Sequence, residues 1–167
     1  MKKLIVSLIL LITTLPCYGT DFCETVEVIQ ENYCLKNITP AKIDRLIYVN
    51  ELSDIIEDAT GLLFSKKPID RVYKLTTIEE IKRFLEYDDT DKLLYVIDWR
   101  DCDDFAKILM VRVSLWTIGL AFGYISIDNG SHVINIFVDS NLQVWGIDAQ
   151  KDVVYEIDFI NSENIVF

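Results

Sequence analysis

The spacing of the apolar residues changes at Gly119, and this change constrains the fold more than any other feature of the sequence. Before Gly119, apolar residues recur every three or four positions, the period of a helix, whereas after it they form short strand-like runs. The first two runs flank Asn129 and Gly130, a pair typical of tight hairpin turns because both residue types tolerate positive φ. The predicted strands are 121–127, 132–138, 142–147 and 153–157.

Helices are predicted in the part of the chain before Gly119. Thr39, Pro40 and Ala41 favour a helix start, and helical spacing continues with a break near Asn50. A second start is indicated at Thr76 or Thr77, and a third helix begins at Cys102. The apolar positions behind the first two predictions are Ile43, Leu46, Ile47, Leu52, Ile55 and Ile56, then Ile78, Ile81, Phe84 and Leu85. Helices followed by an antiparallel sheet predict an α+β fold.

The first nineteen residues have the pattern of a secretory signal peptide. Lys2 and Lys3 precede the apolar run 4–15, and Gly19 follows as a small residue where a signal peptidase could cut. The run is too short to cross a bilayer of about 30 Å, so no stable membrane anchor is expected. We expect a signal peptide at 1–19, one domain at 20–167, and a secreted or periplasmic product.

The charge of the chain argues against nucleic acid as a partner. Asp and Glu number 27 against 16 Lys and Arg, whereas binding to a phosphate backbone requires a basic surface. The same reasoning disfavours anionic membrane surfaces. The oligomeric state is left open by the sequence.

After export, three cysteines would remain: Cys23, Cys34 and Cys102. Cys23 and Cys34 are close in sequence and are the natural pair for a disulfide in an oxidising compartment. Cys102 is then left over. It is either an inert buried thiol, a common state for free cysteine, or a reactive one, because a helix N-terminus lowers the pKa of a thiol.

The only histidine, His132, opens a predicted strand directly after the hairpin turn. Asp148 closes the following strand, and an antiparallel pairing would bring the two side by side. A Cys–His pair needs a third polar group to orient the imidazole. The pattern therefore indicates Cys102 as nucleophile, His132 as base and Asp148 as orienting acid, with Gln150 or Asn135 as alternatives.

Three sequence segments together resemble a known family. They are Asp101-Cys102-Asp103-Asp104-Phe105-Ala106, His132-Val133-Ile134-Asn135-Ile136-Phe137 and Val144-Trp145-Gly146-Ile147-Asp148-Ala149-Gln150. They resemble the papain-like cysteine protease domain at the C-terminus of the Marasmius oreades agglutinin and its bacterial and phage relatives. The resemblance covers residues 98–152 and implies a papain-like fold, with Cys102, His132 and Asp148 in the positions of the triad.

That family depends on calcium, so the resemblance also implies a Ca²⁺ site. Asp103 and Asp104 lie within the first matching segment, and Asp98 and Asp101 are close by. Clusters of carboxylates suit Ca²⁺, which takes six to eight oxygen ligands. Capping of the helix by these aspartates is an equally good explanation.

The function predicted from the sequence is a secreted cysteine hydrolase that cleaves a peptide or amide bond in a peptide or protein substrate through a thioester. Two alternatives stay open at this stage. One is a peptidoglycan amidase or endopeptidase, which keeps the residues and changes the substrate. The other is a secreted binding or immunity protein with the same fold and an inactive site.

Overall fold

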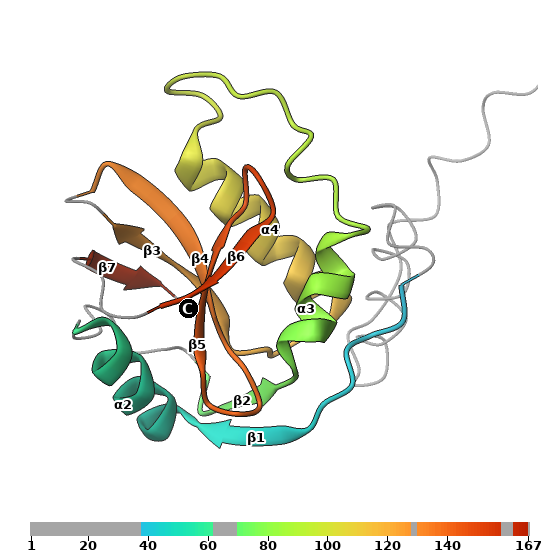
Figure 1. Ribbon diagram of the computed structural model, residues 1–167, viewed down its shortest axis with the longest axis vertical. Coiled ribbons are helices and arrows are strands. Elements are labelled where there is room, and N and C mark those ends of the chain that lie inside the picture. Colours follow the sequence, from blue (N-terminus) through green and yellow to red (C-terminus); the bar gives the residue numbers. More distant parts are fainter. Residues whose placement is uncertain (1–37, 62–69, 128–129, 158–161, 167) are drawn as a thin grey trace, which may run out of the picture.

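Three helices and seven strands form the part of the chain that the computed structural model describes, residues 38–61, 70–127, 130–157 and 162–166 (Figure 1). The helices are α2 (Val49–Thr60), α3 (Ile78–Leu85) and α4 (Cys102–Trp116). The strands are β1 (Arg45–Tyr48), β2 (Val72–Leu75), β3 (Phe122–Ile127), β4 (His132–Val138), β5 (Val144–Asp148), β6 (Val153–Glu156) and β7 (Ser162–Val166).

Five of the strands form one antiparallel sheet with the order β6-β5-β4-β3-β7. The hairpin of β3 and β4 aligns Ile127 with His132, and the next hairpin aligns Val138 with Val144. Strand β7 pairs with the free side of β3. The predicted strand 132–138 is confirmed with the same bounds. The other strands, β1 and β2, form a separate antiparallel pair.

The five-stranded sheet is buried on both faces, as β4 shows. Asn135 and Phe137 lie on the side of α3 and α4, whereas Ile134 and Ile136 belong to the core cluster on the other side. That second cluster also contains Ile47, Leu52 and Ile56 and is covered by α2 and the β1–β2 pair (Figure 1). Because both faces are covered, β4 is apolar along most of its length instead of alternating with polar residues.

Two helix starts follow the sequence signals closely. Thr77 caps α3, and its hydroxyl oxygen accepts a hydrogen bond from the backbone N–H of Glu80 at 3.4 Å. The start predicted at Thr76 or Thr77 is therefore confirmed. Helix α4 begins at Cys102, as predicted, and packs against β3 and β4.

The helix predicted to begin near Thr39 is wrong. Residues 38–44 form no helix, and Arg45–Tyr48 is strand β1, in which Arg45 pairs with Leu75. Ile47 is fully buried while Leu46 is 61% exposed, which is the alternation of a strand and not the face of a helix. The partner strand lies more than twenty residues away, so local spacing could not reveal it. The helix α2 begins only at Val49.

Smaller differences concern the sheet. Strand β5 begins at Val144, two residues later than predicted, because Leu142 lies in a turn with φ 68°. The carboxylate of Asp139 stabilises this turn by accepting hydrogen bonds from the backbone N–H groups of Asn141 and Gln143. Strand β7 has no counterpart among the predicted strands. The signal peptide at 1–19 and the Cys23–Cys34 disulfide lie outside the described residues.

Among the helices of the described part of the chain, none combines the length and the apolar character needed to span a bilayer.

Candidate functional site

The predicted site residues form two groups. One lies at the start of α4, and in the other His132 at the start of β4 lies near Asp148 at the end of β5. Asp101 precedes the helix in an extended conformation, and its carbonyl oxygen accepts a hydrogen bond from the N–H of Phe105 at 3.1 Å. Asp103 and Asp104 occupy the first turn, where carboxylates interact favourably with the positive end of the helix dipole. Cys102, between Asp101 and Asp103, is a half-buried free thiol.

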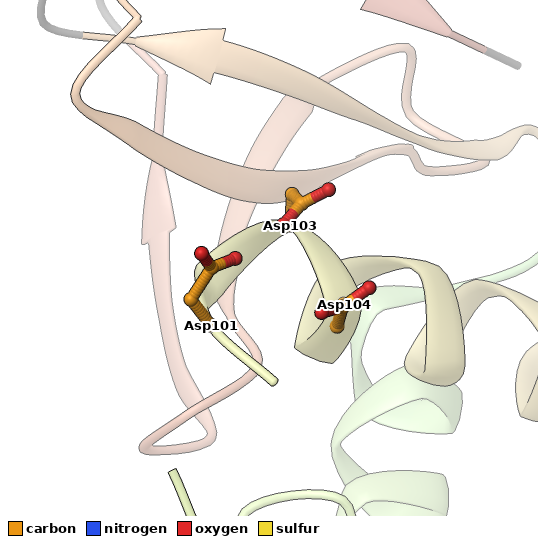
Figure 2. Close-up of side chains that lie close together, drawn as sticks. All are labelled: Asp101, Asp103 and Asp104. Atoms are coloured by element: carbon orange, nitrogen blue, oxygen red, sulfur yellow. The ribbon is translucent and has the colours of Figure 1, made fainter. Parts of the chain in front are cut away.

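Three carboxylates cluster at this helix end (Figure 2). One oxygen each of Asp101, Asp103 and Asp104 lie within 4.8 Å of one another. Oxygens on opposite sides of a Ca²⁺ ion stand about 5 Å apart, so the three could bind one ion and leave several coordination positions for other ligands. Lys107 now pairs with Asp103 and Asp104, and its exposed side chain would have to turn away.

The closeness of these carboxylates shifts the pKa values of Asp101 and Asp103 in opposite directions. A side-chain hydrogen bond with Asp103 raises the pKa of Asp101, because the proton between the two carboxyl groups is retained. The same hydrogen bond, together with that from Lys107, lowers the pKa of Asp103. A divalent cation would replace this shared proton and relieve the repulsion, so the residues present fit Ca²⁺.

His132 and Asp148 are neighbours, as the hairpin geometry predicts, but their contact is loose. His132 Nε2 lies 3.8 Å from Asp148 Oδ2, which is beyond hydrogen-bond range. Asp148 is instead engaged locally: Lys151 Nζ lies 3.0 Å from Oδ2, and the backbone N–H of Gln150 donates to Oδ1 at 3.0 Å. The carboxylate therefore stabilises the turn after β5 more directly than it orients the imidazole.

Helix α4 begins at Cys102 and strand β4 begins at His132, and the hydrogen bond from Asn135 to Ala106 joins the first turns of the helix to the first half of the strand. Within the described residues, however, no hydrogen bond joins the thiol to the imidazole. Asn135, the third candidate for orienting His132, has a structural role instead. Its side-chain nitrogen donates to the carbonyl oxygens of Ala106 at 2.9 Å and Gly123 at 3.1 Å, which fastens α4 to the sheet.

The segment before α4 is unusually apolar for a surface loop. Trp99 is 85% exposed, and the large hydrophobic side chains of residues 94–97 are exposed as well. Neighbouring exposed apolar side chains are typical of interaction sites. Trp99 stands two residues before Asp101, so the loop and the carboxylate cluster adjoin. Sequence patterning identified no role for the run 93–97, because short apolar runs are typical of buried strands.

Comparisons with known proteins find similarity in structure only. No protein-family model matches the chain, and no curated protein matches it. A solved PSL1a–E64 complex has 19% sequence identity and a TM-score of 0.64, and the match covers 73% of this chain and 51% of that one. A crystal structure of Polyporus squamosus lectin bound to the human-type influenza-binding epitope Neu5Aca2-6Galb1-4GlcNAc has 19% identity and a TM-score of 0.60, and the match covers 73% of this chain and 49% of that one.

The chain thus spans about half the length of the structures that it matches, and at this level of identity the likeness concerns the fold. The comparisons correct four sequence-based predictions: the family resemblance, the papain-like fold class, the cysteine hydrolase function and the protease or amidase activity. One of the two structures is that of a lectin bound to an oligosaccharide.

A peptide or protein substrate is likewise unsupported, and with it the peptidoglycan alternative. The choice of Cys102, His132 and Asp148 as site residues stays a prediction from the sequence, as does the binding of Ca²⁺ by Asp103 and Asp104.

Proposed function

We propose that this chain is an exported carbohydrate-binding protein whose ligand site lies at the N-terminal end of α4 and includes Ca²⁺. The observation that carries the proposal is the exposed side chain of Trp99, two residues before the first of the clustered carboxylates of Asp101, Asp103 and Asp104. The sequence left open a secreted binding or immunity protein without naming its ligand, and a carbohydrate ligand is added here. Export rests on the signal peptide predicted at 1–19.

The chemistry of a sugar matches both parts of this site. Its hydroxyl oxygens are hard ligands of the kind that Ca²⁺ prefers, and three carboxylates alone do not complete a shell of six to eight oxygens. Its C–H faces are apolar and can pack on an exposed aromatic ring such as that of Trp99. One ligand can therefore coordinate the ion and cover the indole at the same time.

The likeness in fold to a lectin that has been crystallised with an oligosaccharide supports the proposal. Because the match covers only about half of that lectin, the identity of the sugar that this chain binds is also a proposal. The trisaccharide Neu5Aca2-6Galb1-4GlcNAc is the first ligand to test.

The experiment is titration of the mature protein with this trisaccharide and with a glycan array, in the presence of Ca²⁺ and of a chelator. We expect binding only with Ca²⁺, and a loss of at least about tenfold, ~1.4 kcal/mol, in Trp99→Ala. Tyr48→Ala is the matched control, because Tyr48 is an exposed aromatic residue on β1. Cys102→Ala should bind as the wild type does. Binding unaffected by Trp99→Ala, or lost in Cys102→Ala alone, contradicts the proposal.

Calcium is tested separately by thermal melting. At about a hundredfold excess of Ca²⁺ over its Kd, the melting midpoint should rise by about 5 °C or more. The double variant Asp101→Asn with Asp104→Asn should lose this shift, whereas Asp54→Asn, an exposed position on α2, should retain it. An unchanged midpoint in the wild type would rule out the ion.

A further inference from the structure

A groove of about 660 Å³ runs along the outer side of α4, opposite the face that packs on the sheet. Leu93 and Arg100 line it from the loop before the helix, and the remaining lining residues come from the helix itself. Those that matter for its chemistry are the cations Lys107 and Arg112 and the apolar side chains of Val111 and Leu115. Its volume is typical of sites for small organic ligands.

The side chains that line this groove contrast with the acidic character of the chain, although Lys107 is paired with Asp103 and Asp104. The chain has a formal net charge of −11, yet three of the seven lining residues are cationic and none is acidic. Arg112 is held in place by Asp88, whose side chain is only 1% exposed, and by Thr90. Arg100 takes part in no ion pair among the described residues, and its guanidinium donates only to the carbonyl oxygen of Leu94, at 3.2 Å.

The hydrogen-bonding capacity of the lining identifies the class of ligand. Arginine and lysine side chains offer donors and no acceptor, and the other four lining residues are apolar. A peptide in such a groove would leave its own N–H donors without partners, which is costly in apolar surroundings. A ligand with acceptors at one end and hydrocarbon elsewhere leaves nothing unpaired. A carboxylate fits best, because guanidinium binds it through two parallel hydrogen bonds.

We propose that the groove binds a long-chain carboxylate of the fatty-acid type, with its head on Arg100 and its chain over Val111 and Leu115. Val111 is 53% exposed without such a ligand, and covering it would remove apolar surface from water. Lys107 borders both this groove and the proposed sugar site, because it lines the groove and pairs with Asp103 and Asp104. The carboxylate proposal rests on Arg100 and the apolar lining and does not depend on sugar binding.

The test uses the full mature protein and a fluorescent probe, dansylaminoundecanoate, displaced by dodecanoate. Binding should be saturable, and methyl dodecanoate and dodecyltrimethylammonium should fail to displace the probe. Arg100→Gln should weaken binding at least tenfold, while Arg100→Lys retains part of it. Val111→Glu should weaken it as well, whereas Val153→Glu, at a 49% exposed position outside the groove, should not.

Thermal melting of each variant separates loss of binding from loss of fold. Displacement by the methyl ester as strong as that by the acid would overturn the proposal, because the head group would then have no role. Equal binding by a folded Arg100→Gln variant would overturn it as well. So would adsorption of the protein to vesicles of anionic phospholipid combined with no binding of the free carboxylate.

Discussion

The side-chain nitrogen of Asn135 on β4 lies 2.9 Å from the carbonyl oxygen of Ala106 on α4 and donates a hydrogen bond to it. The same nitrogen also donates to the carbonyl oxygen of Gly123 on β3, and Asn135 is fully buried. One amide thus links the helix that begins at Cys102 to two adjacent strands. The position of the candidate site relative to the sheet depends on this link.

Replacing Asn135 by Ala should lower the free energy of unfolding by about 2–4 kcal/mol. The variant loses two buried hydrogen bonds and leaves a small cavity between α4 and the sheet. Urea unfolding measures the change. Asn141→Ala, at an exposed turn position, is the matched control and should stay within about 0.5 kcal/mol of the wild type. A similar small effect in Asn135→Ala would show that the amide does not hold the helix.

The raised pKa of Asp152 predicts that the protein becomes less stable as the pH rises. Burial, and then repulsion from Asp91 and Asp88, raises the pKa of Asp152 to about 7. The folded protein therefore keeps a proton that the unfolded chain releases near pH 4, so ionisation between pH 4 and pH 7 opposes folding. The destabilisation is complete above pH 7 and absent below pH 4.

Asp152→Asn should remove this penalty. Because the side chain is partly exposed, the gain after allowance for solvent screening is about 1–2 kcal/mol at pH 8, with little change at pH 4. Asparagine also tolerates the φ of 52° at this position. Chemical unfolding at both pH values measures the difference. A gain of the same size at pH 4 and pH 8 would contradict the role of ionisation.

Position 146 on β5 has no room for a side chain, because the ring of Tyr155 lies against the backbone of Gly146. A Cβ at position 146 would lie 2.6 Å from Cε2 and 2.8 Å from Cζ of Tyr155, its cross-strand partner on β6. Gly146→Ala should therefore cost about 1–3 kcal/mol through overpacking. In a double-mutant cycle, Tyr155→Ala should remove most of that cost. Additive effects of the two changes would contradict the clash.

Thr117 anchors the segment before β1 to the end of α4. Its hydroxyl oxygen accepts a buried hydrogen bond from the backbone N–H of Ala41 at 2.8 Å. Thr117→Val keeps the shape but leaves that N–H without a partner, so stability should fall by about 1–3 kcal/mol. Ser114→Ala, which removes an exposed hydroxyl on α4, should be nearly neutral. Equal losses in the two variants would show that burial of the Ala41 N–H is unimportant.

Local signals account for the elements that could be predicted. The cap at Thr77 and the start of α4 at Cys102 depend on neighbouring residues, and so does the hairpin that aligns Ile127 with His132. The strand at Arg45–Tyr48 depends on its pairing with residues far along the chain, and spacing alone assigned it to a helix. The wrong choice of family has a similar origin, because short motifs leave most of the chain unaligned.

The sequence by itself determined where α4 begins, where β4 begins and ends, and that Asp148 comes near His132. Only the tertiary structure decided what these residues contact. Because α4 packs on the sheet, the side chain of Asn135 donates a hydrogen bond to the carbonyl oxygen of Ala106. In the turn after β5, the carboxylate of Asp148 accepts hydrogen bonds from Lys151 and Gln150 and not from the imidazole. The physical reason is the distance along the chain over which the stabilising contacts act. Helix starts and hairpins depend on hydrogen bonds between near neighbours, whereas the partner of a side chain depends on which distant surfaces pack together.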